Sequence, residues 1–372
     1  MVTVLPGPLL PLMAARWGLR DVQSGAFFAA LFLASTVGSI FSPHWLRRNL
    51  PLGYSSMTAG VLLLIAAGST AKAAVGHALS LTAFALVGLG VGLSVTATNL
   101  LVGITVEGRD GGGIGERARR ISIVNLWWGI GAVACPWLIA AAEQHGRLRS
   151  LLVLVAVGTA AMFLALVPQW GKPEFGTGAG TRATLRSEAG ILTFFAALLF
   201  LYVGVETVVG GWITTYANRF SGLTVARAGL IVSLYWMAVL AGRWLGSVAL
   251  KAVAERVVLL PALAMSLFAV VVLVAPHSTV VVLVAVAAAG AGFGPVFPIA
   301  VSRMLGRLSD HRNTGWVFAM TASGGAVLPW LTGLVSTRTG SLRDGFLVAV
   351  AALVAILGLA AGENAILPEC RG

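Results

Sequence analysis

Charge is scarce in this chain, and so is cysteine. Only 10% of the 372 residues are charged, whereas 58% are hydrophobic and the mean hydropathy is +0.92. Soluble domains carry roughly 25% charged residues, so this composition excludes a soluble globular protein. The two cysteines, Cys135 and Cys370, cannot form a disulfide framework. The composition therefore predicts an all-α integral membrane protein.

Motifs for nucleotide binding and hydrolysis are also missing. No G-x-x-x-x-G-K-[ST] loop occurs, and the glycine run at 111–115 lacks both the lysine and the preceding strand that phosphate binding requires. None of the five histidines has a metal ligand or a general base three or four residues after it, one helical turn away. The sequence thus predicts no enzyme, no metal site and no cofactor. Any transport would be driven by ion or solute gradients.

Apolar segments long enough to cross a bilayer recur along the whole chain. About 20 helical residues cross roughly 30 Å of hydrocarbon. The predicted spans are 24–43, 54–71, 78–105, 120–142, 149–167, 190–217, 225–250, 256–274, 278–304, 315–336 and 345–366. The segment 2–15 is apolar but reaches only about 21 Å and contains three prolines. We expect it to be a partial first helix, or the remainder of one whose true start lies upstream, giving twelve in all.

The two halves of the chain carry an internal repeat. Three ordered matches relate Gly18–Arg48 to Gly222–Ala252, Gly88–Ser94 to Ala288–Gly294, and Gly131–Leu138 to Gly324–Leu331. In the second match, Gly90 falls on Gly290 and Gly92 on Gly292. The repeat predicts two bundles of six helices, at 1–167 and 190–372, joined by a polar cytoplasmic linker at 168–189.

Basic residues indicate the orientation of the chain. More Lys and Arg fall in the loops on the side of the linker than in those on the other side, which predicts that both termini are cytoplasmic. The expected location is the inner membrane. The net charge of +12 is then a signal of topology and of contact with anionic lipids. The sequence has no basic patch interleaved with aromatic residues, so nothing in it predicts nucleic-acid binding.

Several motifs carry a resemblance to a known family. They are LYVGVETVVGGWITTYANRF (Leu201 to Phe220), SLYWMAVLAGRWLGSVALKAVAERV (Ser233 to Val257), GFGPVFPIAVSRM (Gly292 to Met304) and GGAVLPWLTGLVSTRTGSLRDG (Gly324 to Gly345). The chain resembles the major facilitator superfamily over its whole length, and within it the fucose/galactose/hexose sugar-proton symporter branch. The family's loop signature survives as Gly38 with Arg47 and Arg48, and in the second half as Gly242 and Arg243.

Glu206 is the only acid deep within any predicted span. A carboxylate in the membrane costs roughly 2.5–3.5 kcal/mol even on insertion scales, so it usually faces a cavity and has a function. Tyr202 lies four residues earlier on the same helical face and can hydrogen-bond it. We interpret Glu206 as a proton-coupling or substrate-binding carboxylate; the alternative is a buried acid that holds its helix in place. Arg243 lies roughly 10 Å from the membrane edge, which favours a gating or structural role over a direct pair with Glu206.

Polar residues at membrane depth in the first half are Thr96, Asn99 and Asn125. They are candidates for substrate binding, with hydrogen bonding between helices as the alternative. In the symporter branch that this chain resembles, an acid occurs where this chain has Val95. Either Glu206 has taken over proton coupling, or the protein is a uniporter.

Aromatic side chains complete the candidate site, because sugar rings stack on indole and phenol rings. The candidates on the expected cavity helices are Trp128, Trp212, Tyr216, Trp236 and Trp330. Trp212 and Tyr216 could instead belong to an aromatic belt at the membrane surface, and Trp330 could be structural.

These features favour a monomeric secondary transporter of a small polar solute, most simply a sugar taken up with protons by rocking of two bundles. An exporter of hydrophobic or cationic compounds is the nearest alternative. A non-transporting receptor or lipid-handling membrane protein is the alternative from another class.

Overall fold

The structure is a computed structural model. It describes the backbone of the 372-residue chain except 43–44, 111–113, 171–187, 251, 276–277, 308–313 and 368–372. Side chains are described outside those segments, except at 99–100, 102–126, 169, 225–226, 305–306, 314–315 and 364.

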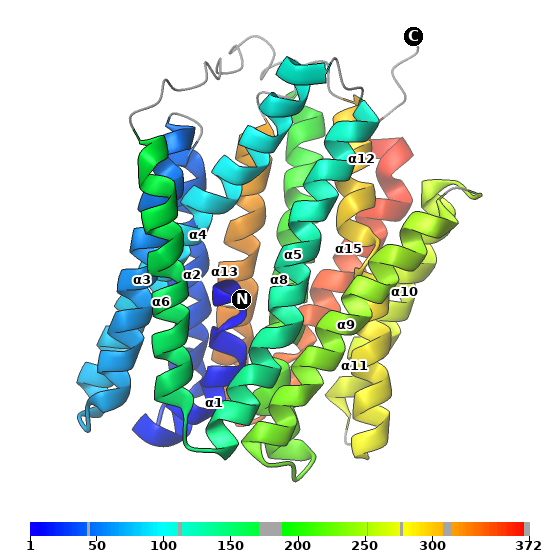
Figure 1. Cartoon of the computed structure of the whole chain (residues 1–372). Helices are drawn as coiled ribbons and strands as arrows, with labels where there is room; N and C mark the ends of the chain where they lie inside the picture. Colours follow the sequence, from blue (N-terminus) through cyan, green and yellow to red (C-terminus); the bar gives the residue numbers. More distant parts are fainter. Residues whose placement is uncertain are drawn as a thin grey trace.

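Every regular element in the described part of the chain is a helix (Figure 1). The first half contains η1 (Val2–Val4), α1 (Pro6–Trp17), α2 (Asp21–Phe41), α3 (Leu46–Ser69), α4 (Ala73–Asp110), α5 (Ile114–Gln144), α6 (Leu148–Leu166) and η3 (Val167–Gln169). The second half contains α8 (Ala189–Phe220), α9 (Val225–Ala249), α10 (Glu255–Val274), α11 (Thr279–Phe293), α12 (Val296–Arg307), α13 (Thr314–Thr339), α14 (Leu342–Gly345) and α15 (Leu347–Ile366).

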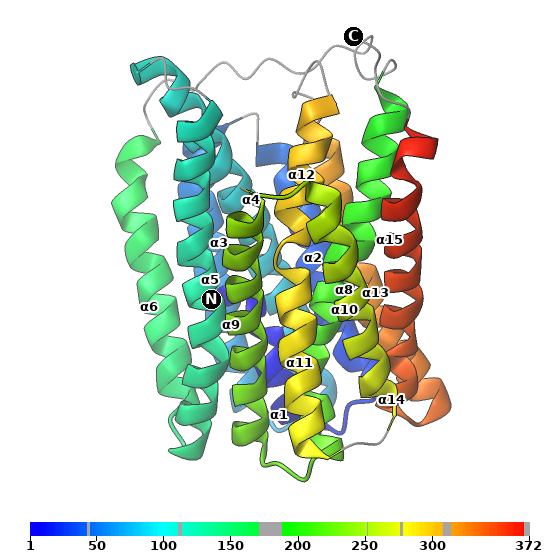
Figure 2. The same cartoon turned by 90° about the vertical axis from the view of Figure 1, so that its right-hand side faces the viewer.

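Ten helical stretches in the described residues are long and apolar enough to cross a membrane. The 31-residue α5 and the 12-residue α1 bring the number of bundle helices to twelve. Because α1 begins at Pro6 and ends at Trp17, the prediction of a short first helix is confirmed. The chain is a multi-pass membrane protein built as two six-helix bundles, seen from two sides in Figures 1 and 2.

Helices alternate in direction, so the molecule has two opposite faces. We call the face at which α6 ends and α8 begins the linker face, and the one at which α1 and α8 end the opposite face (Figure 1). The proposed limits of the linker itself stay a prediction, because 171–187 lie outside the described residues.

Glycine contacts show the internal repeat in three dimensions. Gly88 of α4 packs against the Leu31 carbonyl of α2, and Gly290 of α11 packs against the Tyr235 carbonyl of α9. A Cβ at either glycine would collide with that carbonyl, so both bundles need a glycine for the same close helix contact.

The same correspondence continues along these helices. Gly92 meets Ser35 of α2 just as Gly294 meets Val239 of α9. The predicted register, with Gly90 on Gly290, is therefore wrong by two residues, since a run of alternating glycines matches itself after such a shift. The structure pairs Gly90 with Gly292.

Two seams join the bundles, and the repeat relates them. We call them the α2–α13 seam and the α5–α9 seam. At the first, a Cβ on Gly25 would lie 3.1 Å from the Pro329 carbonyl; at the second, a Cβ on Gly229 would lie 3.6 Å from the Pro136 carbonyl. Equivalent helices of the two bundles thus meet at the interface through equivalent residues. The α2–α13 seam is more tightly packed at this point.

Some predicted helix bounds need correction. The predicted span 54–71 begins at Leu46, so Arg47 and Arg48 lie in the first turn of α3 rather than in a loop. The predicted span 278–304 is divided at Gly294 and Pro295, between α11 and α12. Pro295 lacks the N–H that would continue the helix, which explains the division.

Candidate functional site

The break between α11 and α12 exposes backbone carbonyls inside the second bundle. Pro298 has no N–H, so the Gly294 carbonyl lacks its helical donor four residues later. Arg243 of α9 supplies a donor instead, with Nε 3.3 Å from that oxygen. The neighbouring Gly242 packs against the Ala291 carbonyl, which a Cβ would prevent. The pair Gly242 and Arg243 therefore holds α9 against the broken helix.

Glu206 lies next to this break. Tyr202, on the same face of α8 one turn earlier, has its hydroxyl oxygen 2.8 Å from Glu206 Oε1 and 3.0 Å from the Phe293 carbonyl. The hydrogen bond predicted from the spacing of Tyr202 and Glu206 is confirmed. Tyr202 is fully buried, and Glu206 is partly buried. Tyr235 of α9 donates to the backbone carbonyl of Glu206 at 3.2 Å, which fixes α8 against α9 at this level.

Arg243 and Glu206 are linked without a direct ion pair in the described part of the chain. Their connection runs through Tyr202 and two consecutive carbonyls, those of Phe293 and Gly294. The opposite charges nevertheless attract each other electrostatically. A change in the charge of Glu206 would therefore be felt at the break between α11 and α12.

An aromatic pair spans the α5–α9 seam beside this site. Trp128 and Trp236 meet edge to face, with ring centroids 5.4 Å apart and planes at 88°. The Trp236 ring also packs close to Gly210, one turn after Glu206 on α8. Its Nε1 is buried and has no hydrogen-bond partner among the described residues, which is unusual for a tryptophan in a protein interior. The structure thus brings together two of the aromatic residues predicted separately.

Three other predicted aromatic residues have structural contacts. Trp212 is fully buried and donates from Nε1 to the Pro329 carbonyl at 3.0 Å. Tyr216, also fully buried, donates to the Leu273 carbonyl at 2.6 Å. Neither belongs to a belt at the membrane surface, because Tyr216 is enclosed within the second bundle and Trp212 is buried between α8 and Phe28 of α2. Trp330 packs at the α2–α13 seam, where its backbone touches Gly25.

The polar candidates of the first bundle are described less fully. Thr96 lies on α4 and is partly buried. Asn99 on α4 and Asn125 on α5 have side chains outside the described residues, so their part in the site stays a prediction. Gly38 packs against the Leu89 carbonyl and joins α2 to α4. In the described part of the chain, no group of three or more His, Cys, Asp or Glu side chains could hold a metal ion.

Asp21 and its partners are missed by the sequence reasoning. The Asp21 carboxylate, at the start of α2, accepts hydrogen bonds from Arg219 of α8 at 2.5 and 2.6 Å and from Ser336 of α13 at 2.5 Å. The backbone N–H of Val22 donates to Thr337 at 2.9 Å. These bonds close the opposite face of the bundle interface. Sequence spacing gave no signal, since Arg219 lies 198 residues from Asp21.

A second buried acid is also missed. Glu363, near the end of α15, pairs with Arg303 at 2.9 Å and with Arg307 at 3.2 Å, both from α12. It is only 2% exposed. This cluster fastens α12 to α15 at the linker face, within the second bundle.

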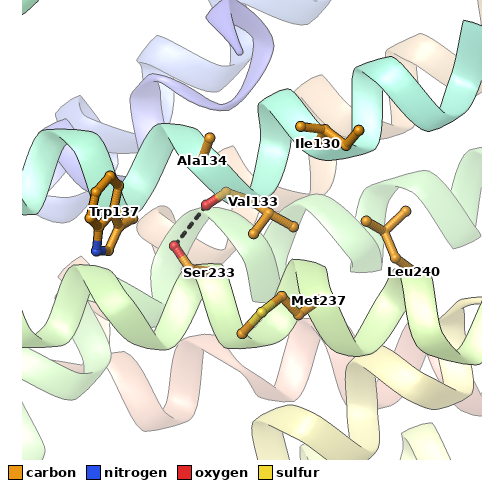
Figure 3. A pocket seen from close by; sticks show the side chains of 7 residues that line it. All are labelled: Ile130, Val133, Ala134, Trp137, Ser233, Met237 and Leu240. Carbon is orange, nitrogen blue, oxygen red and sulfur yellow. Dashed lines mark hydrogen bonds between the residues drawn. The ribbon is translucent and has the colours of Figure 1, made fainter.

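A recess of about 470 Å³ opens along the α5–α9 seam (Figure 3). Its lining residues are Ile130, Val133, Ala134, Trp137, Ser233, Met237 and Leu240. A polar contact crosses it, from the Ser233 hydroxyl, which donates to the Val133 carbonyl at 2.9 Å. Trp137 and Met237 are half exposed, so the recess faces outward from the bundles and does not contain Glu206.

Comparison with known proteins gives relatives at low sequence identity. The chain is 24% identical over 390 residues to the glucose/galactose transporter of Brucella abortus, a match that covers 98% of this chain and 91% of that protein. It is 26% identical over 258 residues to the TsgA homolog of Erwinia tasmaniensis, covering 67% of this chain and 62% of that protein. For the TsgA homolog of Edwardsiella ictaluri, the matched part is 53% of the relative's length.

Solved structures share the fold over nearly the whole chain. The fucose:proton symporter FucP of E. coli is 18% identical, with a TM-score of 0.65 and coverage of 97% of this chain and 95% of FucP. A D-xylose-proton symporter is 14% identical, with a TM-score of 0.70 and coverage of 95% and 93%. The family model of the Major Facilitator Superfamily matches residues 1–329. The chain therefore belongs to the Major Facilitator Superfamily.

Proposed function

We propose that the protein is a secondary transporter of a sugar or similar small polar solute, coupled to protons through Glu206. The superfamily membership and the relative named as a glucose/galactose transporter support the transport of a sugar. Alternating access would come from rocking of the two bundles about the α2–α13 and α5–α9 seams. We further propose an inner-membrane location with the linker face and both termini in the cytoplasm, and function as a monomer.

The observation that carries proton coupling is the position of the Tyr202 hydroxyl between two acceptors. A tyrosine hydroxyl has one proton, yet Glu206 Oε1 and the Phe293 carbonyl both lie within hydrogen-bond distance. If Glu206 is ionised, the Tyr202 proton can serve only one of these acceptors. If Glu206 is protonated, it donates to Tyr202, and Tyr202 donates to the carbonyl.

Protonation of Glu206 would therefore complete a chain of hydrogen bonds that ends at the broken helix. Loss of the proton would leave one acceptor there unpaired, at a cost of about 1–3 kcal/mol. A difference of this size is enough to shift a conformational equilibrium by about tenfold or more. This gives a physical route from proton binding to movement of α12.

The solute would bind between the indoles and the carboxylate. Trp128 and Trp236 offer aromatic surface on which the CH face of a sugar ring can stack. The unpartnered Trp236 Nε1 can donate to a sugar hydroxyl, and Glu206 Oε2, which receives no hydrogen bond from the described residues, can accept from one. Donor and acceptor would then be supplied from two neighbouring helices, α9 and α8.

The test is transport by purified protein in proteoliposomes. We expect labelled hexose to accumulate when a proton gradient is imposed and to stop accumulating after Glu206→Gln, which keeps an oxygen for Tyr202 but cannot exchange a proton. Counterflow exchange, which needs no net proton movement, should persist in this variant. Glu255→Gln, at a 38% exposed carboxylate, is the charge-matched control and should behave as the wild type.

Three outcomes would contradict parts of the proposal. Accumulation by Glu206→Gln equal to the wild type would remove Glu206 from coupling. Uptake that ignores the proton gradient in the wild type would leave a uniporter. Binding of none of a panel of hexoses, pentoses and nucleosides, measured by thermal stabilisation, would exclude a sugar-like solute.

A further inference from the structure

A second pocket lies within the first bundle, at the opposite face and away from Glu206. Its volume is about 390 Å³, within the range of small-molecule sites. The ends of α1, α3 and α5 and the start of α6 contribute its lining, together with Ser80 of α4. The deeper wall is apolar and is formed by Leu9, Leu12, Met13, Leu64 and Leu152.

Two residues that line this pocket each carry a buried polar atom with no hydrogen-bond partner among the described residues. The atoms are Nε1 of Trp17, at the end of α1, and Oγ of Ser80 on α4. Trp17 is 7% exposed and Ser80 is completely buried. Buried donors are almost always satisfied, and an unpaired one costs about 1–3 kcal/mol. Two such atoms beside one cavity would both be satisfied by a ligand that brings acceptors to them.

The mouth of the pocket carries charge. Three charged side chains line the mouth. Arg16 of α1 and Arg149 of α6 are exposed, and Glu143 of α5 is partly buried. Within the described residues, the side chains of this rim make one hydrogen bond, a long one from Arg16 to the Thr70 carbonyl at 3.5 Å. No ion pair joins Glu143 to either arginine in the part of the chain that the structure describes. Two cations against one anion leave the rim positive, at the level where membrane helices end and lipid head groups begin.

We propose that this pocket binds a membrane phospholipid. One acyl chain would lie against the leucines and Met13, and the phosphate would pair with Arg16 and Arg149. The glycerol ester carbonyls, which join these two parts of the lipid, would accept from Trp17 Nε1 and Ser80 Oγ. From its deep end to its mouth, the pocket has an apolar wall, two buried donors and a cationic rim. A phospholipid has its acyl chain, its ester carbonyls and its phosphate in the same order.

The test compares lipids that differ in one feature. The full chain is purified in detergent, and its thermal unfolding is followed with added phosphatidylglycerol, with diacylglycerol of the same acyl chains, and with inorganic phosphate. We expect phosphatidylglycerol to raise the unfolding temperature of the wild type, and the other two to have little effect. Arg16→Gln combined with Arg149→Gln should weaken the phosphatidylglycerol response by about tenfold in concentration, as expected for loss of charge-assisted hydrogen bonds.

Matched variants separate this pocket from general binding of lipid to a basic surface. Arg227→Gln combined with Arg338→Gln removes two arginines from the same face outside the pocket, and should respond as the wild type. Gly68 lines the pocket, and a Cβ there meets no atom within 4 Å, so Gly68→Leu should block the acyl chain without disturbing the fold. Gly158→Leu, on α6 and equally open, is its control.

Each result decides the proposal. An equal response from both arginine pairs, or an unchanged response in Gly68→Leu, would overturn it. A response to inorganic phosphate as large as that to phosphatidylglycerol would show a site for a free anion instead. A response to diacylglycerol as large as that to phosphatidylglycerol would remove the role of the arginines.

Discussion

Asp21 at the start of α2 and Arg219 at the end of α8 form a two-fold hydrogen-bonded ion pair that joins the first bundle to the second. Asp21 is 7% exposed and also accepts from Ser336 of α13. One carboxylate therefore holds two helices of the other bundle at the opposite face. A transporter that opens toward that face has to break this contact.

Asp21→Asn should favour opening of that face. The variant keeps the shape of the side chain but removes the charge that binds Arg219, at a cost of about 1.5–3 kcal/mol. We expect a cysteine at Ser24, which is completely buried one turn into α2, to react about tenfold faster with a membrane-impermeant maleimide. The background carries Cys135→Ala and Cys370→Ser. Arg338→Gln, at the same face without a charged partner in the described residues, should leave the reaction rate unchanged; an equal increase would mean that any loss of charge loosens this face.

Tyr202→Phe should reduce both stability and proton coupling. The change removes the only side-chain donor to the Phe293 carbonyl and to Glu206 in the described residues, and an unpaired buried acceptor costs about 1–3 kcal/mol. Tyr216→Phe is the matched control, because Tyr216 is equally buried and donates to the Leu273 carbonyl. The unfolding temperature should fall in both variants. The dependence of uptake on the proton gradient should fall only in Tyr202→Phe. If Tyr216→Phe lost coupling to the same extent, the loss in Tyr202→Phe would be explained by lower stability alone.

The approximate positions of the helices follow from the lengths of the apolar segments, and the repeat follows from three ordered sequence matches. The bond between Tyr202 and Glu206 is predictable as well, because it is set by helical spacing within α8. Contacts between helices are different. The pairing of Trp128 with Trp236 depends on how α5 docks against α9, and the enclosure of Trp212 and Tyr216 depends on which way α8 is turned. Sequence gives the depth of a side chain in the membrane, but its direction around the helix axis is fixed only by packing.

Trp236→Phe should weaken solute binding while sparing stability. Phenylalanine keeps an aromatic ring at the α5–α9 seam but removes the Nε1 donor, which has no partner in the part of the protein that the structure describes. We expect a solute dissociation constant about tenfold higher, in keeping with about 1–1.5 kcal/mol for one hydrogen bond. Trp212→Phe removes an indole that is bonded to the Pro329 carbonyl, and should lower the unfolding temperature without changing affinity. Isothermal titration checks the first result and thermal unfolding the second; the reverse pattern would move the site away from Trp236.

Gly38→Ala and Gly242→Ala should destabilise the protein to a similar extent. A Cβ at Gly38 would collide with the Leu89 carbonyl of α4, and one at Gly242 with the Ala291 carbonyl of α11. Overpacking of this kind typically costs about 1–3 kcal/mol. Gly158→Ala, in open space on α6, should instead gain up to about 1 kcal/mol from helix propensity. Thermal unfolding in one detergent compares all three, and a loss at only one of the two repeat positions would show that the bundles are not equivalent at this contact.

The two seams described above are related by the repeat but differ in what crosses them. Polar bonds from Asp21 and Val22 cross the α2–α13 seam or its edge, whereas the α5–α9 seam has the Ser233 bond and an open apolar recess. Apolar contacts lack preferred directions and can slide, while hydrogen bonds hold a fixed geometry. The bundles should therefore not part evenly on both sides. The α2–α13 seam, which has more polar bonds, would act as the hinge when the bundles tilt. The α5–α9 seam would widen and narrow, and lipid tails would fill its recess as the width changes.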